Sequence, residues 1–190
     1  MNQAAVQETK LTKVDFSKQG RVTDNFEDCT FEHCSFSKTN LSNIIFSECT
    51  FIGCDFSIAA LAKTVLRGAC FKECKLLGLH FEQCNNFIFT VDFENCILDL
   101  SCFYKLSLKK TRFRKCSLHE VDFTECDLTG ALFEHCDLRG AKFDRTVLAK
   151  ADLRTSFNYA IDPERNRLTK AKFSAAGIAG LLGKYNIEID

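Results

Sequence analysis

What the sequence lacks narrows its possible functions. Its 190 residues include no tryptophan and one proline, and 25 basic residues balance 25 acidic ones, so the formal net charge is zero. A neutral balance gives no general attraction to nucleic acid or to anionic membranes. No apolar run approaches the roughly 20 residues that span a bilayer, and Met1 to Phe16 lacks the apolar core of a signal peptide. We therefore expect one cytoplasmic domain that neither enters a membrane nor binds nucleic acid directly.

Motifs that carry catalysis are also missing. The chain has no glycine-rich phosphate loop, no nucleophile elbow and no paired carboxylates placed to share a pocket. None of its four histidines can be matched to a fixed acid or nucleophile partner. The prediction is a protein that is not an enzyme, with no catalytic residue, no metal site and no cofactor.

Phenylalanine and cysteine are abundant, with 19 and 12 residues, and both recur at a fixed spacing. From Cys116 to Leu153 a large apolar residue stands at every fifth position, called i, and a small residue stands two places before it, at i−2. A period of five fits neither a helix, at 3.6, nor a strand, at 2. The same spacing runs through nearly the whole chain, which predicts a repeat architecture.

This pattern, with Ala, Cys, Val or Thr at i−2, often Asp or Asn at i−1 and Leu or Phe at i, resembles the pentapeptide-repeat family over about residues 14–156. The resemblance implies an all-β fold: a right-handed quadrilateral parallel β-helix with four pentapeptides to a coil, about seven coils, and i and i−2 pointing inward. Three parts are expected: an N-terminal segment 1–13 that is partly disordered or a cap, the β-helix 14–156, and a C-terminal segment 157–190 with a loop, a capping or dimerisation helix and a short strand.

With twenty residues to a coil, inward positions stack into columns. Stacked strands lie about 4.8 Å apart, whereas a disulfide needs Cβ atoms about 3.5 to 4.5 Å apart, so we expect a column of reduced thiols. A second column is aromatic and belongs to the core. The columns contain Cys34, Cys54, Cys74, Cys96, Cys116 and Cys136, and Phe31, Phe51, Phe71, Phe93, Phe113 and Phe133. Ligands spread along a line cannot converge on a metal, and His33 and His135 should point outward at i+2.

Outward positions support the same coil length. The i+1 column alternates in sign at each coil from Lys72 through Glu94, Arg114 and Glu134 to Arg154. A shorter column of Lys105, Glu125 and Arg145 does likewise. Opposite charges on adjacent strands stabilise the pairing by a few tenths of a kcal/mol, roughly, when they are exposed.

The register shifts by two residues near Asn85 and Asn86. We interpret this shift as a small bulge at a corner of the coil rather than as a recognition loop. Counting by fives places Ile88 inward, so Phe87 and Phe89 should face outward. Together with Tyr104 they would form an exposed apolar patch, and such patches often mark interfaces.

The pattern changes after Ser156. Residues 158–167 are expected to form a loop and 168–173 a final partial repeat. Ser174 suits a helix N-cap, and Asn186 can end that helix before a short strand at 187–189. The layout resembles the Qnr and MfpA quinolone-resistance branch of the family, which implies a homodimer; a monomer with the helix folded back as a cap is the alternative. Ile178, Leu181, Leu182 and Tyr185 have the i, i+3, i+4, i+7 spacing of a helix, and the resemblance implies that they form the dimer interface.

Two functions are compatible with these features. One is a general protein-interaction module or scaffold. The other, implied by the same resemblance, is a DNA mimic that binds a type II topoisomerase, DNA gyrase or topoisomerase IV, and protects it from quinolones or toxins. A mimic needs a continuous acidic face, and the candidate acidic surface forms one ring between basic coils. Its residues are Glu120, Asp122, Glu125, Asp127, Glu134 and Asp137.

Overall fold

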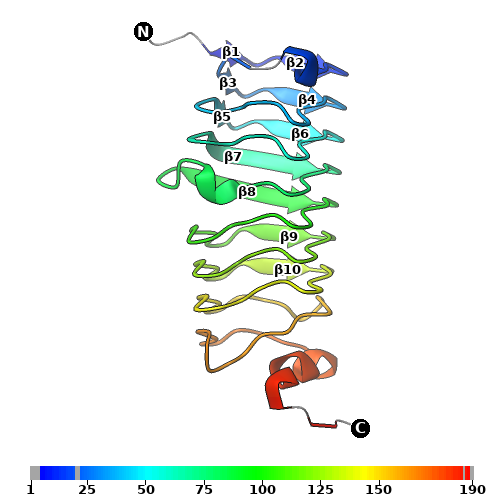
Figure 1. The fold of residues 1–190 in the computed structure, drawn as a ribbon, viewed down its shortest axis with the longest axis vertical. Helices are drawn as coiled ribbons and strands as arrows, with labels where there is room; N and C mark the ends of the chain where they lie inside the picture. The colour runs from blue at the N-terminus through cyan, green and yellow to red at the C-terminus, as the bar shows by residue number, and fades with distance from the viewer. Residues whose placement is uncertain (1–4, 20–21, 186, 189–190) are drawn as a thin grey trace.

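The computed structural model describes residues 5–19, 22–185 and 187–188, and it shows a parallel β-solenoid whose coils stack along one axis from the N-terminus to the C-terminus (Figure 1). Within the described residues all strand pairings are parallel. The strands are β1 (Val6–Gln7), β2 (Lys10–Thr12), β3 (Phe26–Glu27), β4 (Thr30–Glu32), β5 (Ile45–Ser47), β6 (Thr50–Ile52), β7 (Val65–Lys72), β8 (Phe89–Glu94), β9 (Arg112–Arg114) and β10 (Leu132–Glu134). Four 3₁₀ segments accompany them: η1 (Phe16–Gln19), η2 (Phe81–Gln83), η3 (Ala175–Leu181) and η4 (Gly183–Tyr185).

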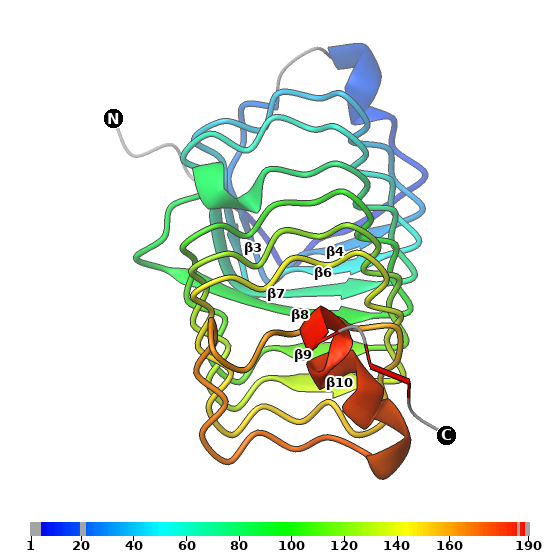
Figure 2. The same cartoon turned by 60° about the horizontal axis from the view of Figure 1, so that its bottom comes forward.

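The strand register confirms the expected coil of twenty residues. Phe31 pairs with Phe51, and Phe113 with Phe133. The strands β1 and β2 lie inside the N-terminal segment expected at 1–13, and they pair with β3 and β4 at the same offset of twenty. Viewed obliquely toward the C-terminal end, the coils superpose as a four-cornered outline (Figure 2).

The apolar positions of the repeat fill the interior, as predicted. Each phenylalanine of the predicted column is at most 2% exposed. Rings on successive coils stack, with the centroids of Phe113 and Phe133 4.9 Å apart and their planes 5° from parallel. Rings of neighbouring columns meet edge to face, as Phe103 and Phe113 do at 6.2 Å. Both geometries suit the aromatic quadrupole and add to the free energy gained by burying the rings.

All twelve cysteines are free thiols, and the six of the predicted column are buried. Most of the column's thiols donate to the backbone oxygen of a residue on the preceding coil; the Cys54 Sγ, for example, lies 3.4 Å from the carbonyl oxygen of Phe31. A small side chain at i−2 therefore also provides a hydrogen-bond donor to a carbonyl inside the solenoid, which accounts for Cys, Thr and Ser sharing this position.

The corners of the coil follow from the residues at i−1 and i+2. An Asp or Asn at i−1 accepts a hydrogen bond from the backbone N–H two residues later, as Asp55 does from Ser57 at 2.8 Å. The residue at i+2 adopts a left-handed conformation, occupied by glycine at Gly53 and Gly130 and by a polar residue at most other corners. This geometry directs the i+1 and i+2 side chains outward.

The prediction for the two-residue shift was wrong in its inward residue. Asn85 still donates its backbone N–H to Thr64, twenty-one residues back as in the regular coils, but Leu66 pairs with Phe89 and Ala69 with Val91. Three residues are therefore inserted before Phe89 and one is omitted after it, which gives the net shift of two. As a result Phe89 is buried at 7% exposure, and Ile88, predicted inward, is 44% exposed.

The C-terminal segment covers the last coil. Arg167 and Lys172 pair with the preceding coil, which confirms a final partial repeat. The Ser174 Oγ accepts a hydrogen bond from the Gly177 N–H at 3.1 Å, so the predicted N-cap is present, but the helix is a 3₁₀ helix rather than an α-helix. Residues 187–188 are not in a strand, and Asn186 and Ile189 lie outside the described residues. No described helix is long and apolar enough to cross a membrane.

Candidate interaction surfaces

Half of the acidic ring has a structural role. Asp122, Asp127 and Asp137 occupy i−1, and each accepts a hydrogen bond from the backbone N–H two residues later. In Asp127 the same oxygen also accepts the Thr129 hydroxyl at 2.6 Å. These carboxylates hold corners of the coil together, so their presence does not by itself indicate an acidic binding face.

Basic residues on the adjacent coils neutralise much of the ring. Glu125 lies 3.5 Å from Lys105 and 2.8 Å from Arg145, which confirms the predicted alternation in that column. Asp127 also pairs with Lys109 at 3.1 Å, Glu134 with Arg114 at 3.7 Å, and Asp137 with Arg139 at 3.7 Å; the His119 ring lies 2.9 Å from Asp137. The longer column is only partly paired: Arg114 also binds Glu94 at 2.9 Å, while Arg154 turns to Asp152 at 2.8 Å.

Two of these acids are held in the charged form. Burial opposes ionisation of Asp127, but hydrogen bonds from Thr129 and the nearby Lys109 ammonium outweigh it and lower the pKa of the carboxyl below its ordinary value. Burial likewise opposes ionisation of Asp137, whose pKa is lowered by hydrogen bonds from His119 and Asn158. Both carboxylates remain ionised at neutral pH, and each has a basic or polar partner on a neighbouring coil.

Glu120 and Asp122 differ from the rest of the ring. In the described part of the chain neither forms an ion pair. Asp122 is half-buried and Glu120 is exposed. They lie on the same side of the solenoid, so the uncompensated acidic charge of this coil is local rather than a ring.

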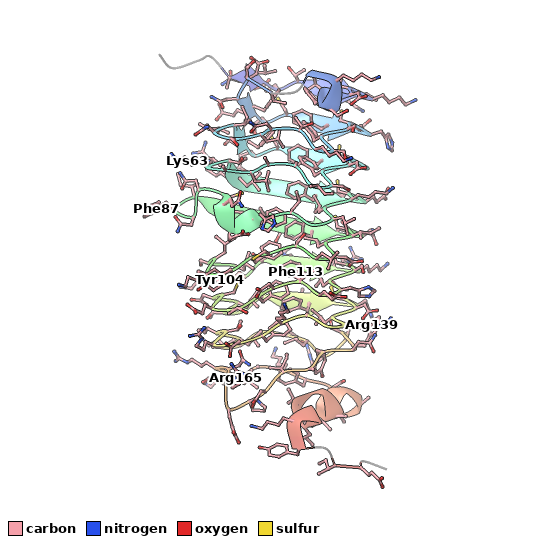
Figure 3. The ribbon with its side chains drawn as sticks, viewed as in Figure 1. Lys63, Phe87, Tyr104, Phe113, Arg139 and Arg165 are labelled. Carbon is pink, nitrogen blue, oxygen red and sulfur yellow. The ribbon has the colours of Figure 1, made fainter. Side chains whose placement is uncertain are left out.

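The predicted apolar patch is only partly present. Phe87 is 94% exposed and lies at the tip of the inserted loop, where its N–H is bound by the Asn85 side chain at 3.1 Å. Tyr104 is 36% exposed on the same edge of the solenoid (Figure 3). Phe89 does not contribute, because it fills the interior. The alternation of Phe89, Val91 and Phe93 with polar residues is the period of a strand, and that signal could have assigned Phe89 correctly.

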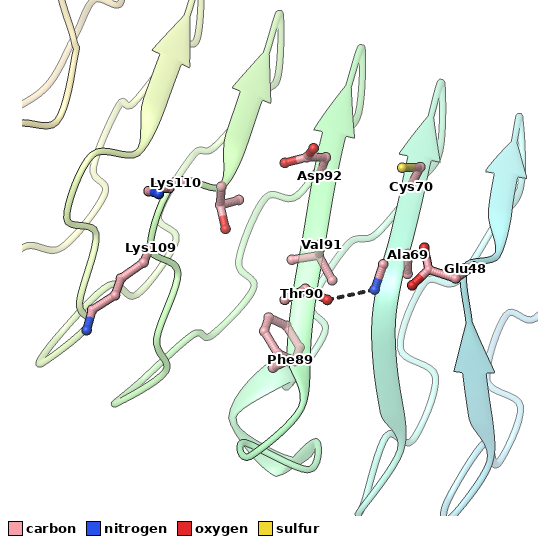
Figure 4. Close-up of a pocket in the computed structure, with 11 residues that line it drawn as sticks. Glu48, Ala69, Cys70, Phe89, Thr90, Val91, Asp92, Lys109 and Lys110 are labelled. Atoms are coloured by element: carbon pink, nitrogen blue, oxygen red, sulfur yellow. Dashed lines mark hydrogen bonds between the residues drawn. The ribbon is translucent and has the colours of Figure 1, made fainter.

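A shallow pocket of about 330 Å³ lies beside the shift in register between β7 and β8 (Figure 4). The Gly68 N–H donates to the Thr90 Oγ1 at 2.6 Å there. Burial, followed by the charge of Asp92, raises the pKa of the Cys70 thiol on the same wall, so that thiol is a poor nucleophile. The pocket is lined by acidic residues, Glu48 and Asp92, and by basic residues, Lys109 and Lys110. These side chains do not form an acid and base pair for catalysis.

The C-terminal helix turns part of its predicted interface toward the solenoid. Ile178 is 47% and Tyr185 51% exposed, whereas Leu181 and Leu182 are half-buried. The Tyr185 hydroxyl donates to Glu164 at 3.0 Å. Lys184 binds Glu164 at 2.6 Å and Asp162 at 2.8 Å, which fixes η4 on the last coil. This arrangement is a cap, and dimerisation through its outer side remains a prediction.

The sequence Glu-His-Cys occurs twice, at 32–34 and 134–136, and in both copies the histidine and the cysteine point in different directions. His33 and His135 are exposed while Cys34 and Cys136 are buried, as predicted from their positions in the repeat. Among the described residues, no three His, Cys, Asp or Glu side chains are grouped so that they could hold a metal ion.

A four-cornered parallel solenoid with apolar residues at i and i−2 defines a class of repeat proteins, and comparison with known proteins identifies the family. The family model described as "Pentapeptide repeat region" matches residues 24–86 and 87–158, so the chain belongs to the pentapeptide-repeat family. Comparison with curated protein sequences gives no significant match.

Solved structures of pentapeptide repeat proteins match the chain at low identity. A trypsin-treated form of QnrB1, a plasmid-mediated fluoroquinolone resistance protein, is 18% identical with a TM-score of 0.63, and the match covers 98% of each chain. HetL, a pentapeptide repeat protein involved in regulating heterocyst differentiation in a Nostoc cyanobacterium, is 18% identical with a TM-score of 0.48, over 90% of this chain and 85% of its own. At 18% identity the likeness to QnrB1 is one of fold.

Proposed function

We propose that this protein is a non-enzymatic interaction module that binds a protein partner through the inserted loop. The observation that carries the proposal is the exposure of Phe87: 94% of its side chain is accessible to solvent, in the loop where the register between β7 and β8 shifts. Burying a phenylalanine stabilises a contact by roughly 1.5 to 3 kcal/mol, and aromatic side chains are enriched at the centres of protein interfaces. Nothing within the solenoid requires this side chain.

A photo-crosslinking amino acid at position 87 tests the proposal. Crosslinking in cells of the natural host should give a discrete protein adduct, which excess unmodified protein competes away. The control carries the same group at Lys150, an exposed corner residue several coils from the loop. Equal labelling at both positions, or no competed adduct, would contradict a docking role for the loop.

The narrower hypothesis, a DNA mimic that acts on a type II topoisomerase, rests on the resemblance to the Qnr and MfpA branch. Ion pairing of Glu125, Asp127 and Glu134 weakens it, because a mimic needs uncompensated negative charge along the axis. It is tested by DNA gyrase supercoiling with and without a quinolone, at several salt concentrations. Relief of drug inhibition, or inhibition of supercoiling by the protein alone, would favour the mimic; neither effect at high micromolar protein would exclude gyrase.

The homodimer hypothesis concerns the exposed side of η3. Replacing Ile178 with Asp should dissociate a dimer, whereas Ala176→Asp in the first turn serves as the matched control. Sedimentation equilibrium gives the mass directly. If the wild type is a monomer at micromolar concentration, the dimer hypothesis is wrong and capping is the role that remains for η3.

A further inference from the structure

Two corner residues violate the pattern that the other corners keep. Ile58 and Leu100 adopt the left-handed conformation, with φ of 58° and 61°. Every other described non-glycine residue with positive φ is polar or charged. The left-handed conformation is unfavourable for residues with a Cβ, and for a β-branched residue such as Ile58 it is a genuine outlier. Since Ile58 is 61% and Leu100 57% exposed, these side chains do little for the core.

The two residues occupy the same corner, one on each side of a glycine. Gly78 has the corresponding position on the intervening coil, where a Cβ would lie 3.9 Å from the Ile58 Cγ1. Ile58 donates its N–H to Leu77 at 3.0 Å, and Gly78 donates to Asp99 at 2.9 Å, so the three coils are directly stacked. Gly78 therefore leaves a notch between two exposed aliphatic side chains, and Leu77, 38% exposed, lies beside it.

The apolar surface continues from this corner along the first and third coils of one side; on the middle coil the exposed His80, 2.9 Å from Glu82, lies between them. Ala60 and Ala62 are exposed on the first coil and Cys102 is half-buried on the third, with Tyr104 at the far corner. Residues 57–62, 77–82 and 99–104 contain no Lys or Arg. We call the surface formed by Ile58, Ala60, Leu77, Leu100 and Cys102 the apolar face.

Two acidic residues that form no described ion pair border this face on the next coil, with Lys142 one coil further on beside Asp122. Cys102 pairs with Asp122, and Leu100 donates its N–H to the residue before Glu120, so both acids lie one coil spacing from the apolar face, about 4.8 Å. They are the two acids of the ring that form no ion pair in the described part of the chain. The opposite border holds no acid: Asn40 pairs with Ala60 there, and the exposed Lys38 occupies the corner beside Ile58.

We propose that the apolar face binds an amphipathic helix of a protein partner, with an apolar stripe that has Lys or Arg along one side. Three coils give about 10 Å between the outer rows, which matches the 10–12 Å diameter of a helix. Aliphatic side chains of the stripe would enter the notch at Gly78, and the basic side chains would meet Glu120 and Asp122. A strand would find no free backbone here, since the coils already pair with one another. The inference rests on the proposed function and specifies a second contact beside the loop.

Two synthetic 18-residue helical peptides, identical in their leucine stripe but carrying either Lys or Glu on the polar side, provide the probe. Fluorescence anisotropy should show that the wild type binds the Leu/Lys peptide and that salt weakens the complex, while the Leu/Glu peptide binds at least roughly tenfold more weakly. Leu100→Asn should reduce binding of the Leu/Lys peptide roughly tenfold or more. The double variant Glu120→Gln, Asp122→Asn should reduce it and remove most of its salt dependence.

Glu125→Gln is the matched control, because that acid already binds Lys105 and Arg145, and it should leave peptide binding unchanged. Equal binding of the two peptides, or wild-type affinity in Leu100→Asn, would overturn the proposal. A dimer in sedimentation equilibrium that Leu100→Asn dissociates would also overturn it, since the face would then bind a second copy. A crosslinked adduct at position 87 without peptide binding would contradict this inference but leave the proposed function in place. If neither the adduct nor peptide binding is found, both the inference and the proposed function are wrong.

Discussion

The interior of the solenoid and its outer surface obey different constraints. Inside, each i position from Phe31 to Phe133 in its column holds a phenylalanine, and the rings stack at a repeated distance. Outside, neighbouring coils differ: one corner has Glu94, Arg114 and Glu134 in alternating sign, and another has Ile58 and Leu100 on either side of a glycine. The inward side chains of a coil must pack against those of the coils above and below it, whereas its outward side chains need only be compatible with the backbone conformation.

This difference separates structural features from functional ones. Outward residues that pair with their neighbours stabilise the stack, as Glu125 does between Lys105 and Arg145. Ile58, by contrast, is 61% exposed and adopts a backbone conformation that disfavours its side chain. Backbone strain at an exposed residue is consistent with a functional constraint. In a repeat protein the departures from the repeat are therefore the best guide to a binding surface.

Truncation of the aromatic column should have the largest effect. Phe113→Ala removes a fully buried ring and should lower the free energy of unfolding by roughly 3 to 5 kcal/mol, measured by urea denaturation. Phe87→Ala is the matched control and should change stability by less than about 0.5 kcal/mol, because its ring is exposed. A loss below about 1 kcal/mol for Phe113 would mean that the column is not the core.

Thiol labelling distinguishes interior from surface without a mutation. Burial raises the pKa of Cys126 and of Cys49 to about 12, from an ordinary value of 9.0. At pH 8 such a shift reduces the reactive thiolate roughly a thousandfold, and the rate should increase about tenfold for each pH unit up to that pKa.

Denaturant should release twelve titratable thiols, and the native protein should label slowly, with the half-buried Cys70 and Cys102 ahead of the column. Mass spectrometry of the labelled peptides gives the order. Rapid native labelling of Cys74 or Cys96 would be incompatible with the interior column.

Most of the interior could be predicted from the sequence, because the repeat period of five residues decides which side chains point inward. Once the period of five is recognised, twenty residues to a coil follow from the family resemblance, and the charges at Lys105, Glu125 and Arg145 independently support that length. Counting in fives did not reveal the insertion. Phe87, Ile88 and Phe89 are all apolar, so the repeat period alone cannot show which of them points inward after the loop. The strand alternation that begins at Phe89 was the better signal.

The candidate surfaces were less predictable, because they depend on pairing between residues twenty positions apart. Counting acids gave a ring, but the structure neutralises Asp127 with Lys109 and leaves Glu120 and Asp122 without a cation in the described coils. The apolar face was missed, although aliphatic residues at i+2 are visible in the sequence. The spacing of Ile178 and Leu181 predicted an α-helix, whereas the segment forms the tighter 3₁₀ turn over Tyr159.

Close packing of the C-terminal cap should respond to one methyl group. At Gly180 a Cβ would overlap the backbone oxygen of Tyr159, so Gly180→Ala should displace η3 and lower stability by roughly 1 to 3 kcal/mol. Gly183→Ala is the control, because nothing lies within 4 Å of its Cβ. Hydrogen exchange of the amide of Ile161, which donates to Gly180 at 2.9 Å, reports the displacement locally. Equal exchange in both variants would show that the cap does not depend on this contact.

The smallest effect should have the opposite sign, and it compares fold and function at one residue. Asn adopts the left-handed conformation more readily than Ile, so Ile58→Asn should raise the free energy of unfolding by roughly 0.5 to 1 kcal/mol. The same substitution at Ile45, an exposed strand residue with ordinary backbone, should give no gain. If Ile58 is retained for binding, the more stable variant should bind the Leu/Lys peptide less well, and misfolding could not explain that loss. A variant that is both less stable and equally able to bind would assign Ile58 to the fold and remove it from the apolar face.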